Sequence, residues 1–459
     1  MGTTGKHQNN YLKSLGARIK CELNDLKRTT ESASRDLGLD IKFIESIING
    51  LADSQSYDKF IKRMGQVYPI DTSYLTLIKK DTENGIKYMS IEDSDLTTRV
   101  YERTDGHGET SQYYRYKDTA MSNLSLFKPE WIEVLKEVDD SDPKNLRVVM
   151  NNGHFMHQTT LFIGPVNFYY EDENGNLICE EMNTGDSNYI TPFVKHSFAS
   201  RDKNSFTCIL AVTYGGDISR AQSELHALGE NKLKSFLIKN TFSSLIDLHV
   251  KNAMISMDIL NKLVFDVDPT VDLKSLIQDD KVPKISELQV IASCLNTSVS
   301  SLIPEIDTPD KCVIQRFSKS KYCYYPSNTQ RSYKIFSLAN DKTSNLMKNC
   351  LIKVLSSNHD HNNCFQRSFH TYIINYGSSS VEIQWTHDDN THLKILNKYD
   401  SMYLEPFTKF SFANLSEDES DLFIVGIKSS ITLEAQKELS KFLKPERVIN
   451  QLETWYGKK

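Results

Sequence analysis

Apolar residues near the start of the chain recur every three or four positions. This spacing in LGARIKCELNDLK (15–27) and IKFIESIING (41–50) predicts amphipathic helices. Between them, TTESASRDLGLD (29–40) offers a threonine start signal and a glycine at which a helix can turn. Two helices joined by a short glycine turn form a helix-turn-helix pattern, so we predict a helical domain of this type over residues 1–78.

From about residue 80 the apolar spacing shortens to that of β-strands. Short alternating segments are separated by turn signals such as ENGN and TGDS, which is typical of an all-β barrel or sandwich. The segments are NLRVVMNN (145–152), TTLFIGPVNFYYED (159–172), LICEEMNT (177–184), NYITPFVK (188–195) and SFTCILAVTY (205–214). They predict a β-barrel over residues 79–220.

Helical spacing returns after residue 220, and strands resume at about residue 320. We predict a second helical domain over 221–308, a second barrel over 309–428, and a C-terminal helix within 429–459, where LEAQKELSKFL (433–443) lies. The predicted fold class is α+β, as a tandem repeat of a helical domain followed by a β-barrel.

Local matches between the halves support an internal duplication. TGDSNYITPFVKHSF (184–198) resembles KYDSMYLEPFTKFSF (398–412), and YYRYKDTA (113–120) resembles SYKIFSLA (332–339) more weakly. The second copy differs from the first at three aligned positions: Phe410 occupies the position of His196, Ser332 that of Tyr113, and Ile335 that of Tyr116. We therefore predict that the second barrel is degenerate and that the first one holds the chemistry.

Composition limits the class of protein. Of 459 residues, 39% are hydrophobic and 25% are charged, and no apolar run approaches the roughly 20 residues of a membrane span. The N-terminal MGTTGKHQNNYLKSLG has no apolar stretch behind its lysines, so we expect no secretory signal and a cytoplasmic location. The eight cysteines form no CxxC pair, which disfavours a thiolate zinc site and a disulfide framework.

Charge disfavours binding to nucleic acid. The formal net charge is −6, and the second helix of the helix-turn-helix pattern carries Asp40 and Glu45 against Lys42 alone. Phosphates repel an acidic helix. We therefore favour a structural or active-site role for the helical domain over DNA binding, and expect neither a nucleic acid nor a membrane as partner.

Three polar residues of the first barrel form a candidate metal site. His154 and Gln158 are four positions apart where the chain enters a strand, and His196 follows a Gly-Asp-Ser turn on a later strand. Neighbouring strands could bring the three onto one face of an ion, as in non-haem iron sites that use two histidines and a carboxylate. The alternative is three hydrogen-bonded polar residues inside a barrel. His157 could also replace His154 as the ligand.

NNGH (151–154), GDSNYITPFVKHSF (185–198) and YYRY (113–116) resemble the phosphonate-processing non-haem iron oxygenases. This family pairs a helix-turn-helix-like domain with a cupin barrel, in some members twice in tandem. The resemblance implies an Fe(II) cofactor, O2 as co-substrate and no 2-oxoglutarate. The family places its carboxylate ligand either four residues after the first histidine or six before the last, where this chain has Gln158 and Ile190. It thus matches the branch that holds iron with two histidines and a glutamine, unless Glu180 or Glu181 reaches the metal.

The resemblance also implies which residues bind the substrate, a small phosphonate. They are Asn151, Tyr113, Tyr116, Thr213, an arginine for which Arg103 is the candidate and Arg99 or Arg115 the alternatives, and a lysine. The lysine, Lys27 or else Lys20, would come from the helical domain of a neighbouring subunit, which requires a homo-oligomer.

The implied reaction is an Fe(II)- and O2-dependent cleavage of the carbon–carbon bond of 2-hydroxyethylphosphonate, giving methylphosphonate and bicarbonate or CO2. One alternative within the family is the dioxygenase reaction that gives hydroxymethylphosphonate and formate. Another, from a different class, is a cupin regulator that senses a small anion without catalysis.

Overall fold

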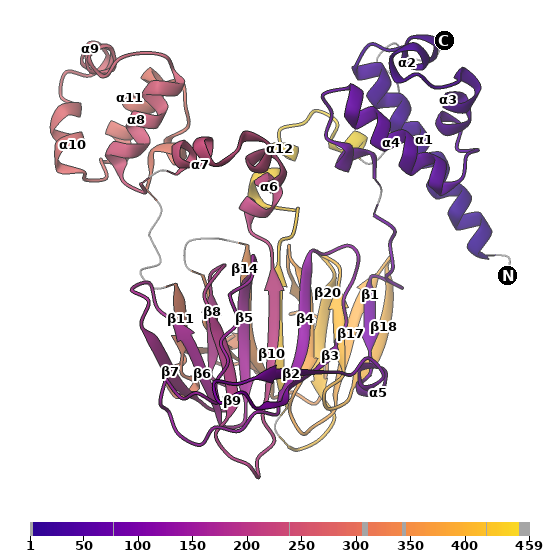
Figure 1. Ribbon diagram of the computed structural model, residues 1–459, viewed down its shortest axis with the longest axis vertical. Coiled ribbons are helices and arrows are strands. Elements are labelled where there is room, and N and C mark those ends of the chain that lie inside the picture. Colours follow the sequence, from indigo (N-terminus) through magenta and orange to yellow (C-terminus); the bar gives the residue numbers. More distant parts are fainter. Residues whose placement is uncertain are drawn as a thin grey trace. The chain divides into compact units, whose positions relative to one another are not determined.

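The computed structural model describes residues 3–76, 78–237, 239–304, 311–341, 346–418 and 420–448 (Figure 1). The predicted domain boundary at 308/309 and the last part of the predicted C-terminal helix region, 449–459, lie outside these ranges. The chain divides into two compact units. The first comprises the residues up to Asp81 together with those from Ile431 on, and the second comprises residues 82–430.

The first unit is helical. Its elements are α1 (Thr3–Asp25), α2 (Thr30–Leu37), α3 (Ile41–Ile48), α4 (Ser54–Val67), η1 (Thr72–Leu75), α12 (Leu433–Leu439) and η4 (Pro445–Val448). The Thr29 side chain accepts a hydrogen bond from Ser32 N at the start of α2, and Gly38 ends this helix in the left-handed region with φ of 66°. The capped start and the glycine turn predicted from the sequence are therefore confirmed.

The second unit is built on two large antiparallel sheets. The strand order of the first is β11 (Cys312–Gln315), β8 (Ser187–Ile190), β5 (His157–Ile163), β10 (Cys208–Tyr214), β4 (Phe127–Val134), β3 (Thr110–Asp118), β2 (Arg99–Thr104). That of the second is β1 (Ile86–Met89), β19 (Ser401–Leu404), β16 (His370–Asn375), β21 (Asp421–Ile427), β14 (Met347–Val354), β13 (Arg331–Ser337), β12 (Tyr322–Pro326). The two orders correspond strand by strand.

A smaller sheet accompanies each large one. The first has the order β7 (Leu177–Met182), β6 (Val166–Glu171), β9 (His196–Ser200), and the second has the order β15 (Phe365–Gln366), β20 (Lys409–Asn414), β17 (Val381–His387), β18 (Asn390–Leu396). The helices of this unit are α5 (Ile91–Asp95), α6 (Asp217–Leu228), α7 (Glu230–Phe236), α8 (Phe242–Asn252), α9 (Met257–Val267), α10 (Leu273–Asp279), α11 (Ile285–Cys294), η2 (Val299–Leu302) and η3 (Phe317–Lys319).

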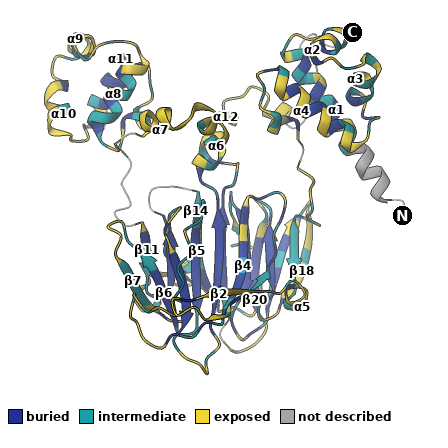
Figure 2. Cartoon of the chain, viewed as in Figure 1, coloured by how far each residue is buried: buried dark blue, intermediate teal, exposed yellow. Residues whose placement is uncertain are grey.

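Buried residues run along the strands of the second unit (Figure 2), and they form separate cores. One lies between the two large sheets, where Trp131 and Tyr214 of the first share a cluster with Tyr372 and Phe423 of the second. Each large sheet also shares a cluster with its own small sheet, which makes two barrel interiors. Burying both faces of each sheet explains why these strands are so apolar. The α+β class with antiparallel, cupin-like sheets is therefore confirmed.

The leading strand of each half pairs with the sheet of the other half. β1 lies beside β19, with Ile86 opposite Leu404, and β11 lies beside β8, with Cys312 opposite Ile190. The sequence did not predict this exchange, because a strand of four residues carries no signal about which of two similar edges it will join. It links the two halves through backbone hydrogen bonds.

One predicted strand is wrong: residues 145–152 (NLRVVMNN) belong to no strand. Side chains bind this backbone in place of a neighbouring strand. Tyr113 Oη accepts a hydrogen bond from Val149 N at 3.0 Å, and Arg103 Nη1 donates to Val149 O at 2.7 Å. The segment TTLFIGPVNFYYED is divided between β5 and β6. In the described part of the chain, no helix is long and apolar enough to cross a membrane.

Candidate metal centre

The side chains of His154, Gln158 and His196 converge inside the first barrel. His154 precedes β5, Gln158 is its second residue, and His196 begins β9 on the facing small sheet. His154 Nε2 lies 3.1 Å from Gln158 Oε1, and the two imidazole rings are 5.3 Å apart between centroids. The register that pairs β5 with β10 sets Gln158 beside Thr213. The three predicted ligands are thus close together.

Both imidazoles are held in the orientation that a metal requires. His154 Nδ1 lies 3.0 Å from Met156 O, and His196 Nδ1 lies 2.9 Å from Val194 O. A backbone carbonyl can only accept, so each Nδ1 carries a proton, and Nε2 is the nitrogen of each ring that can bind a metal. Burial lowers the pKa of His196 to about 4, which keeps this ring neutral at physiological pH. Neutral, anchored histidines are typical metal ligands.

The third donor is a neutral amide. Gln158 Nε2 donates to Thr160 Oγ1 at 2.9 Å, which turns Oε1 toward His154. Ile190, at the other position where the family can carry a carboxylate, is fully buried opposite Gln158. Among the described residues, no three His, Cys, Asp or Glu side chains are grouped so that they could hold a metal ion. The two imidazole nitrogens and one amide oxygen fit a divalent iron, leaving its charge unneutralised by the protein.

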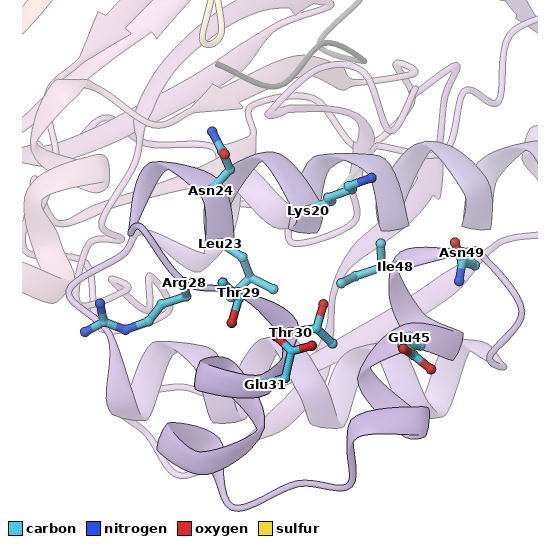
Figure 3. Close-up of a pocket in the computed structure, with 10 residues that line it drawn as sticks. All are labelled: Lys20, Leu23, Asn24, Arg28, Thr29, Thr30, Glu31, Glu45, Ile48 and Asn49. Carbon is cyan, nitrogen blue, oxygen red and sulfur yellow. The ribbon is translucent and has the colours of Figure 1, made fainter. Parts of the chain in front are cut away.

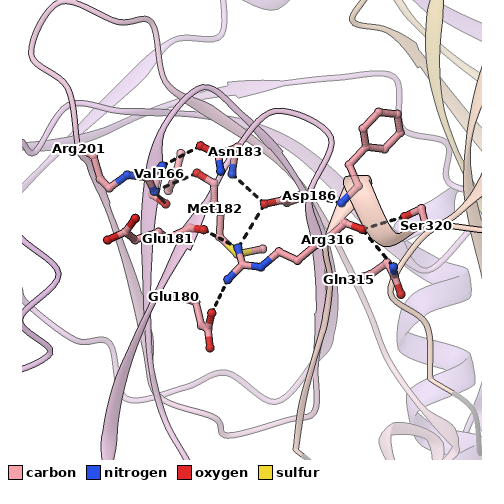
Figure 4. Close-up of polar contacts among 11 residues, drawn as sticks. Val166, Glu180, Glu181, Met182, Asn183, Asp186, Arg201, Gln315, Arg316 and Ser320 are labelled. Carbon is pink, nitrogen blue, oxygen red and sulfur yellow. Dashed lines mark hydrogen bonds and ion pairs between the residues drawn. The ribbon is translucent and has the colours of Figure 1, made fainter.

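The alternative ligands lie elsewhere. His157 belongs to the core between the large sheets: its ring stacks on Tyr189 and Tyr214, and Nδ1 lies 2.7 Å from Tyr189 Oη. Glu180 forms an ion pair with Arg316, the residue that follows β11 (Figure 4). The carbonyl of Glu181 accepts a hydrogen bond from the same guanidinium. Neither glutamate lines the cavity at the metal centre.

A cavity of about 100 Å³ adjoins the three ligands. Of the residues predicted to bind substrate, Arg103, Tyr116, Asn151 and Thr213 line it, and Tyr113 does not. Two further polar residues line it that the sequence did not single out, Tyr114 and Glu130.

Only one of the three candidate arginines faces this cavity. The Arg103 guanidinium lies over the rings of Tyr113 and Tyr114, 4.9 and 5.0 Å from their centroids. Arg99 pairs with Asp118 at 2.8 Å, and Arg115 pairs with Glu133 at 2.6 Å. Arg103 is thus the one positioned to meet an anion in the cavity.

A β-bulge explains the place of Tyr113. On β3, Tyr114 pairs with Tyr101 of β2 and Gln112 pairs with Glu102, so Tyr113 is the extra residue. A bulge breaks the alternation of side chains, and here Tyr113 and Tyr114 both lie in the barrel core. The Tyr113 hydroxyl lies 3.1 Å from Ser197 Oγ and accepts a hydrogen bond from Val149 N. These contacts satisfy the hydroxyl within the protein. Tyr114 and Tyr116, two positions apart, are the phenols that line the cavity.

The candidate lysines belong to the helical unit. Lys27 is exposed in the turn after α1, in left-handed backbone with φ of 58°, and its Nζ donates to Asp25 O at 3.3 Å. Lys20 lines a separate groove of about 380 Å³ between the helices of this unit (Figure 3). Glu31 and Glu45 line the same groove, which makes its charge mixed.

Glu130 is the acidic residue that sequence analysis missed. It lies on β4 between Lys128 and Ile132, and it is partly buried. Burial raises the pKa of its carboxyl, and Arg99 opposes this effect. A glutamate on a strand of alternating character gives no signal of its own, so only the folded barrel identifies Glu130.

The matching positions of the second barrel hold different residues. Phe193 N donates to His154 O, and Phe407 N donates to Arg367 O in the same way. By this match and the strand registers, the second barrel has Arg367 for His154, Thr371 for Gln158, Phe410 for His196 and Gly426 for Thr213. Arg367 Nη2 donates to Lys348 O at 2.9 Å and lies only 2.6 Å from where a Cβ on Gly426 would stand.

The chain has the fold of the phosphonate-processing iron oxygenases. It superposes on Streptomyces albus HEPD with substrate 2-hydroxyethylphosphonate and Fe(II) bound, with a TM-score of 0.89, 28% identity and coverage of 97% of this chain and 99% of that one. A variant of 2-hydroxyethylphosphonate dioxygenase gives a TM-score of 0.72 at 16% identity, covering 93% and 98% of the two chains. No protein-family model matches the chain.

In sequence, the chain is 34% identical over 460 aligned positions to methylphosphonate synthase of Nitrosopumilus maritimus (strain SCM1), covering 98% of this chain and 97% of the relative. The chain belongs to the methylphosphonate synthase family. The resemblance predicted from the sequence motifs is confirmed.

Proposed function

We propose that this protein is a non-haem iron oxygenase that cleaves the carbon–carbon bond of 2-hydroxyethylphosphonate, using Fe(II) and O2 without 2-oxoglutarate. The products are methylphosphonate and bicarbonate or CO2. The observation that carries the proposal is the convergence of His154 Nε2, His196 and Gln158 Oε1 with no carboxylate among them. The membership of the methylphosphonate synthase family and the iron and substrate bound in the HEPD structure support the same reaction.

In this proposal His154, Gln158 and His196 hold the iron, which supplies the O2 chemistry. Because the three donors are neutral, the ion keeps its positive charge for the anionic substrate. Arg103, Tyr116 and Thr213 bind and orient the substrate, with the Arg103 guanidinium matching phosphonate oxygens in charge and geometry. Tyr113 acts indirectly, because its hydroxyl accepts a hydrogen bond from Val149 N and so fixes the backbone two residues before Asn151.

Asn151 would serve both the ligand and the substrate. Its Nδ2 lies 3.1 Å from His196 Nε2, whose lone pair accepts that hydrogen bond. A lone pair serves one partner at a time, so coordination at Nε2 frees the amide N–H for a phosphonate oxygen. Metal binding and substrate binding are thereby coupled through one side chain.

The second barrel is proposed to be a degenerate copy of the first, in a tandem repeat of helix-turn-helix-like and cupin domains. The matching strand orders of the two large sheets support the duplication. Arg367 and Phe410, at the positions of the two histidines, support the loss of metal binding. A partly buried guanidinium at the position of a ligand repels a divalent cation.

We also propose that the enzyme is a cytoplasmic homo-oligomer in which Lys27 of a neighbouring subunit closes over the phosphonate. The exposure of Lys27 in a turn of the helical unit supports a contact made outside that unit. No disulfide joins the eight cysteines, which all lie in the described part of the chain, and this fits a reducing compartment.

The test is phosphorus NMR after 2-hydroxyethylphosphonate and air are added to protein loaded anaerobically with Fe(II). We expect a methylphosphonate signal that disappears in His196→Ala and Gln158→Ala. His226→Ala, which changes an exposed histidine of α6, is the control and should keep the signal. Unchanged substrate with the iron-loaded wild type would contradict the proposal.

The second candidate is the dioxygenase reaction. The TM-score of 0.89 with HEPD favours it, whereas the absence of an acid at Ile190 and Gln158 disfavours it. In the same experiment it predicts a hydroxymethylphosphonate signal together with formate.

A further inference from the structure

Glu130 lines the cavity at the metal centre without a partner. Its side chain makes no hydrogen bond or ion pair with any residue in the described ranges, although it is partly buried. The neighbouring acids are satisfied: Asp118 pairs with Arg99, and Glu133, on the same strand, pairs with Arg115. A carboxyl group that is partly removed from water is expected to be hydrogen-bonded, so the natural partner of Glu130 is a molecule that enters the cavity.

The position of Glu130 gives the cavity an acidic and a basic end. On β4, Val134 pairs with Tyr114, and the Arg103 guanidinium lies over the Tyr114 ring. Glu130, earlier on β4, pairs with Asp118. Four residues along β4 separate these two backbone levels. β4 also pairs with β10, where Glu130 lies opposite Ala211. Ala211 is two residues from Thr213, which pairs with Gln158 of β5. Glu130 is therefore at the end of the cavity away from Arg103.

A cavity with opposite charges at its ends orients an asymmetric ligand. A phosphonate lies with its anionic group toward Arg103 and Asn151, because the reverse orientation would set it against the Glu130 carboxylate. The other end of the ligand then meets Glu130. A hydroxyl can donate a hydrogen bond to a carboxylate, whereas a second anionic group is repelled and brings no proton to share.

We propose that Glu130 is a specificity-determining residue, whose carboxylate accepts a hydrogen bond from the hydroxyl end of the phosphonate substrate and excludes phosphonates with a second anionic group at that end. This inference rests on the proposed function of the same site. It explains why a site built for an anion retains an acidic side chain in its wall.

The test compares two ligands of similar size that differ at the end facing Glu130, 2-hydroxyethylphosphonate and phosphonoacetate. Their dissociation constants are measured by calorimetry on Fe(II)-loaded protein without O2, for the wild type, Glu130→Gln and Glu133→Gln. Glu133→Gln makes the same change on the same strand at a residue that is paired with Arg115 outside the cavity. Iron content and circular dichroism check that each variant is folded and loaded.

We expect the wild type to prefer 2-hydroxyethylphosphonate, and Glu130→Gln to reduce this preference by roughly 10- to 100-fold, mainly by binding phosphonoacetate more tightly. Glu133→Gln should keep the wild-type preference. An unchanged preference in Glu130→Gln, with normal binding of 2-hydroxyethylphosphonate, would overturn the role of Glu130 and leave the proposed function standing. A wild type that binds neither ligand would overturn both. If Glu130→Gln is unfolded, Glu130→Met is measured in its place, with the same expected loss of preference.

Discussion

Asn151 and His196 are joined by three contacts. The backbone N–H of Asn151 donates to His196 O at 3.0 Å, and His196 N donates to Asn151 Oδ1 at 3.0 Å. In addition, Asn151 Nδ2 lies 3.1 Å from His196 Nε2. The asparagine thus fixes the backbone that carries a predicted metal ligand and contacts the nitrogen that we propose to coordinate the metal. Two segments 45 residues apart are held as one rigid piece.

Replacing Asn151 by Ala should therefore weaken metal binding as well as substrate binding. Loss of the Oδ1 acceptor leaves His196 N without its partner, and removal of such an orienting residue typically costs about 10- to 100-fold in metal affinity. The measurement is anaerobic Fe(II) titration of Asn151→Ala. Asn152→Ala, at the exposed neighbouring position, is the control and should bind iron like the wild type. Equal iron affinity in Asn151→Ala would show that this side chain serves the substrate alone.

Gln158→Glu should bind iron more tightly and substrate more weakly. The new carboxylate neutralises part of the charge of the ion, and a phosphonate dianion is then attracted less. We expect the dissociation constant of Fe(II) to fall and that of 2-hydroxyethylphosphonate to rise, both by about tenfold or more. Both constants can be measured by anaerobic calorimetry.

Thr160→Val separates charge from orientation at the same residue. It removes the hydroxyl that accepts from Gln158 Nε2 and leaves the amide neutral. We expect weaker iron binding in this variant, because Oε1 is no longer oriented. Tighter iron binding in Thr160→Val would contradict the role given to this hydrogen bond.

Acid should destabilise the fold through buried histidines away from the metal. Burial lowers the pKa of His370 from its ordinary 6.5 to about 4, and its Nδ1 lies 2.6 Å from Tyr403 Oη. Between these two pH values the unfolded chain binds a proton that the folded chain does not. The free energy of unfolding therefore decreases as the pH falls from 6.5 to 4, by up to about 3 kcal/mol for this group.

Urea denaturation at several pH values between 7.5 and 4.5 measures this effect. In His370→Asn we expect a smaller dependence of the midpoint on pH than in the wild type, whatever the change in stability at neutral pH. His392→Asn, at a partly exposed position of β18, is the control and should keep the wild-type dependence. An identical pH dependence in His370→Asn would contradict the assignment.

Arg316 should stabilise the exchange of strands between the two halves. It follows β11 and pairs with Glu180 and Asp186, while Phe317 N donates to Asp186 Oδ1 at 2.8 Å. Arg316→Ala leaves Asp186, which is largely buried, without its ion pair, so we expect a loss of about 2 to 4 kcal/mol. Thermal unfolding followed by circular dichroism measures it. Lys319→Ala, an exposed basic residue in the adjacent turn, should change the midpoint little.

Much of this protein follows from local sequence. Thr29 and Gly38 mark the ends of α2 because a capping hydroxyl and a left-handed glycine act within a few residues. The match of 184–198 with 398–412 identified related strands, and the structure aligns them, with Tyr170 opposite His196 and Trp385 opposite Phe410. The grouping of His154, Gln158 and His196 was predicted from spacing and motif.

Tertiary structure decided what depends on distant partners. The resemblance implied Tyr113 and Tyr116 as substrate-binding residues, but a bulge set by pairing with β2 brings Tyr114 rather than Tyr113 to the cavity wall beside Tyr116. The sequence left Arg99 and Arg115 as alternatives to Arg103; in the fold they pair with Asp118 and Glu133, and Arg103 lines the cavity.

The exchange of β1 and β11 likewise had no sequence signal, nor did the place of Glu130 in the cavity wall. A strand edge or a cavity wall is formed by residues far apart along the chain. Local preferences determine which elements form and which residues they carry. The pairing of those elements across the fold determines which side chains are satisfied by the protein and which remain for a ligand.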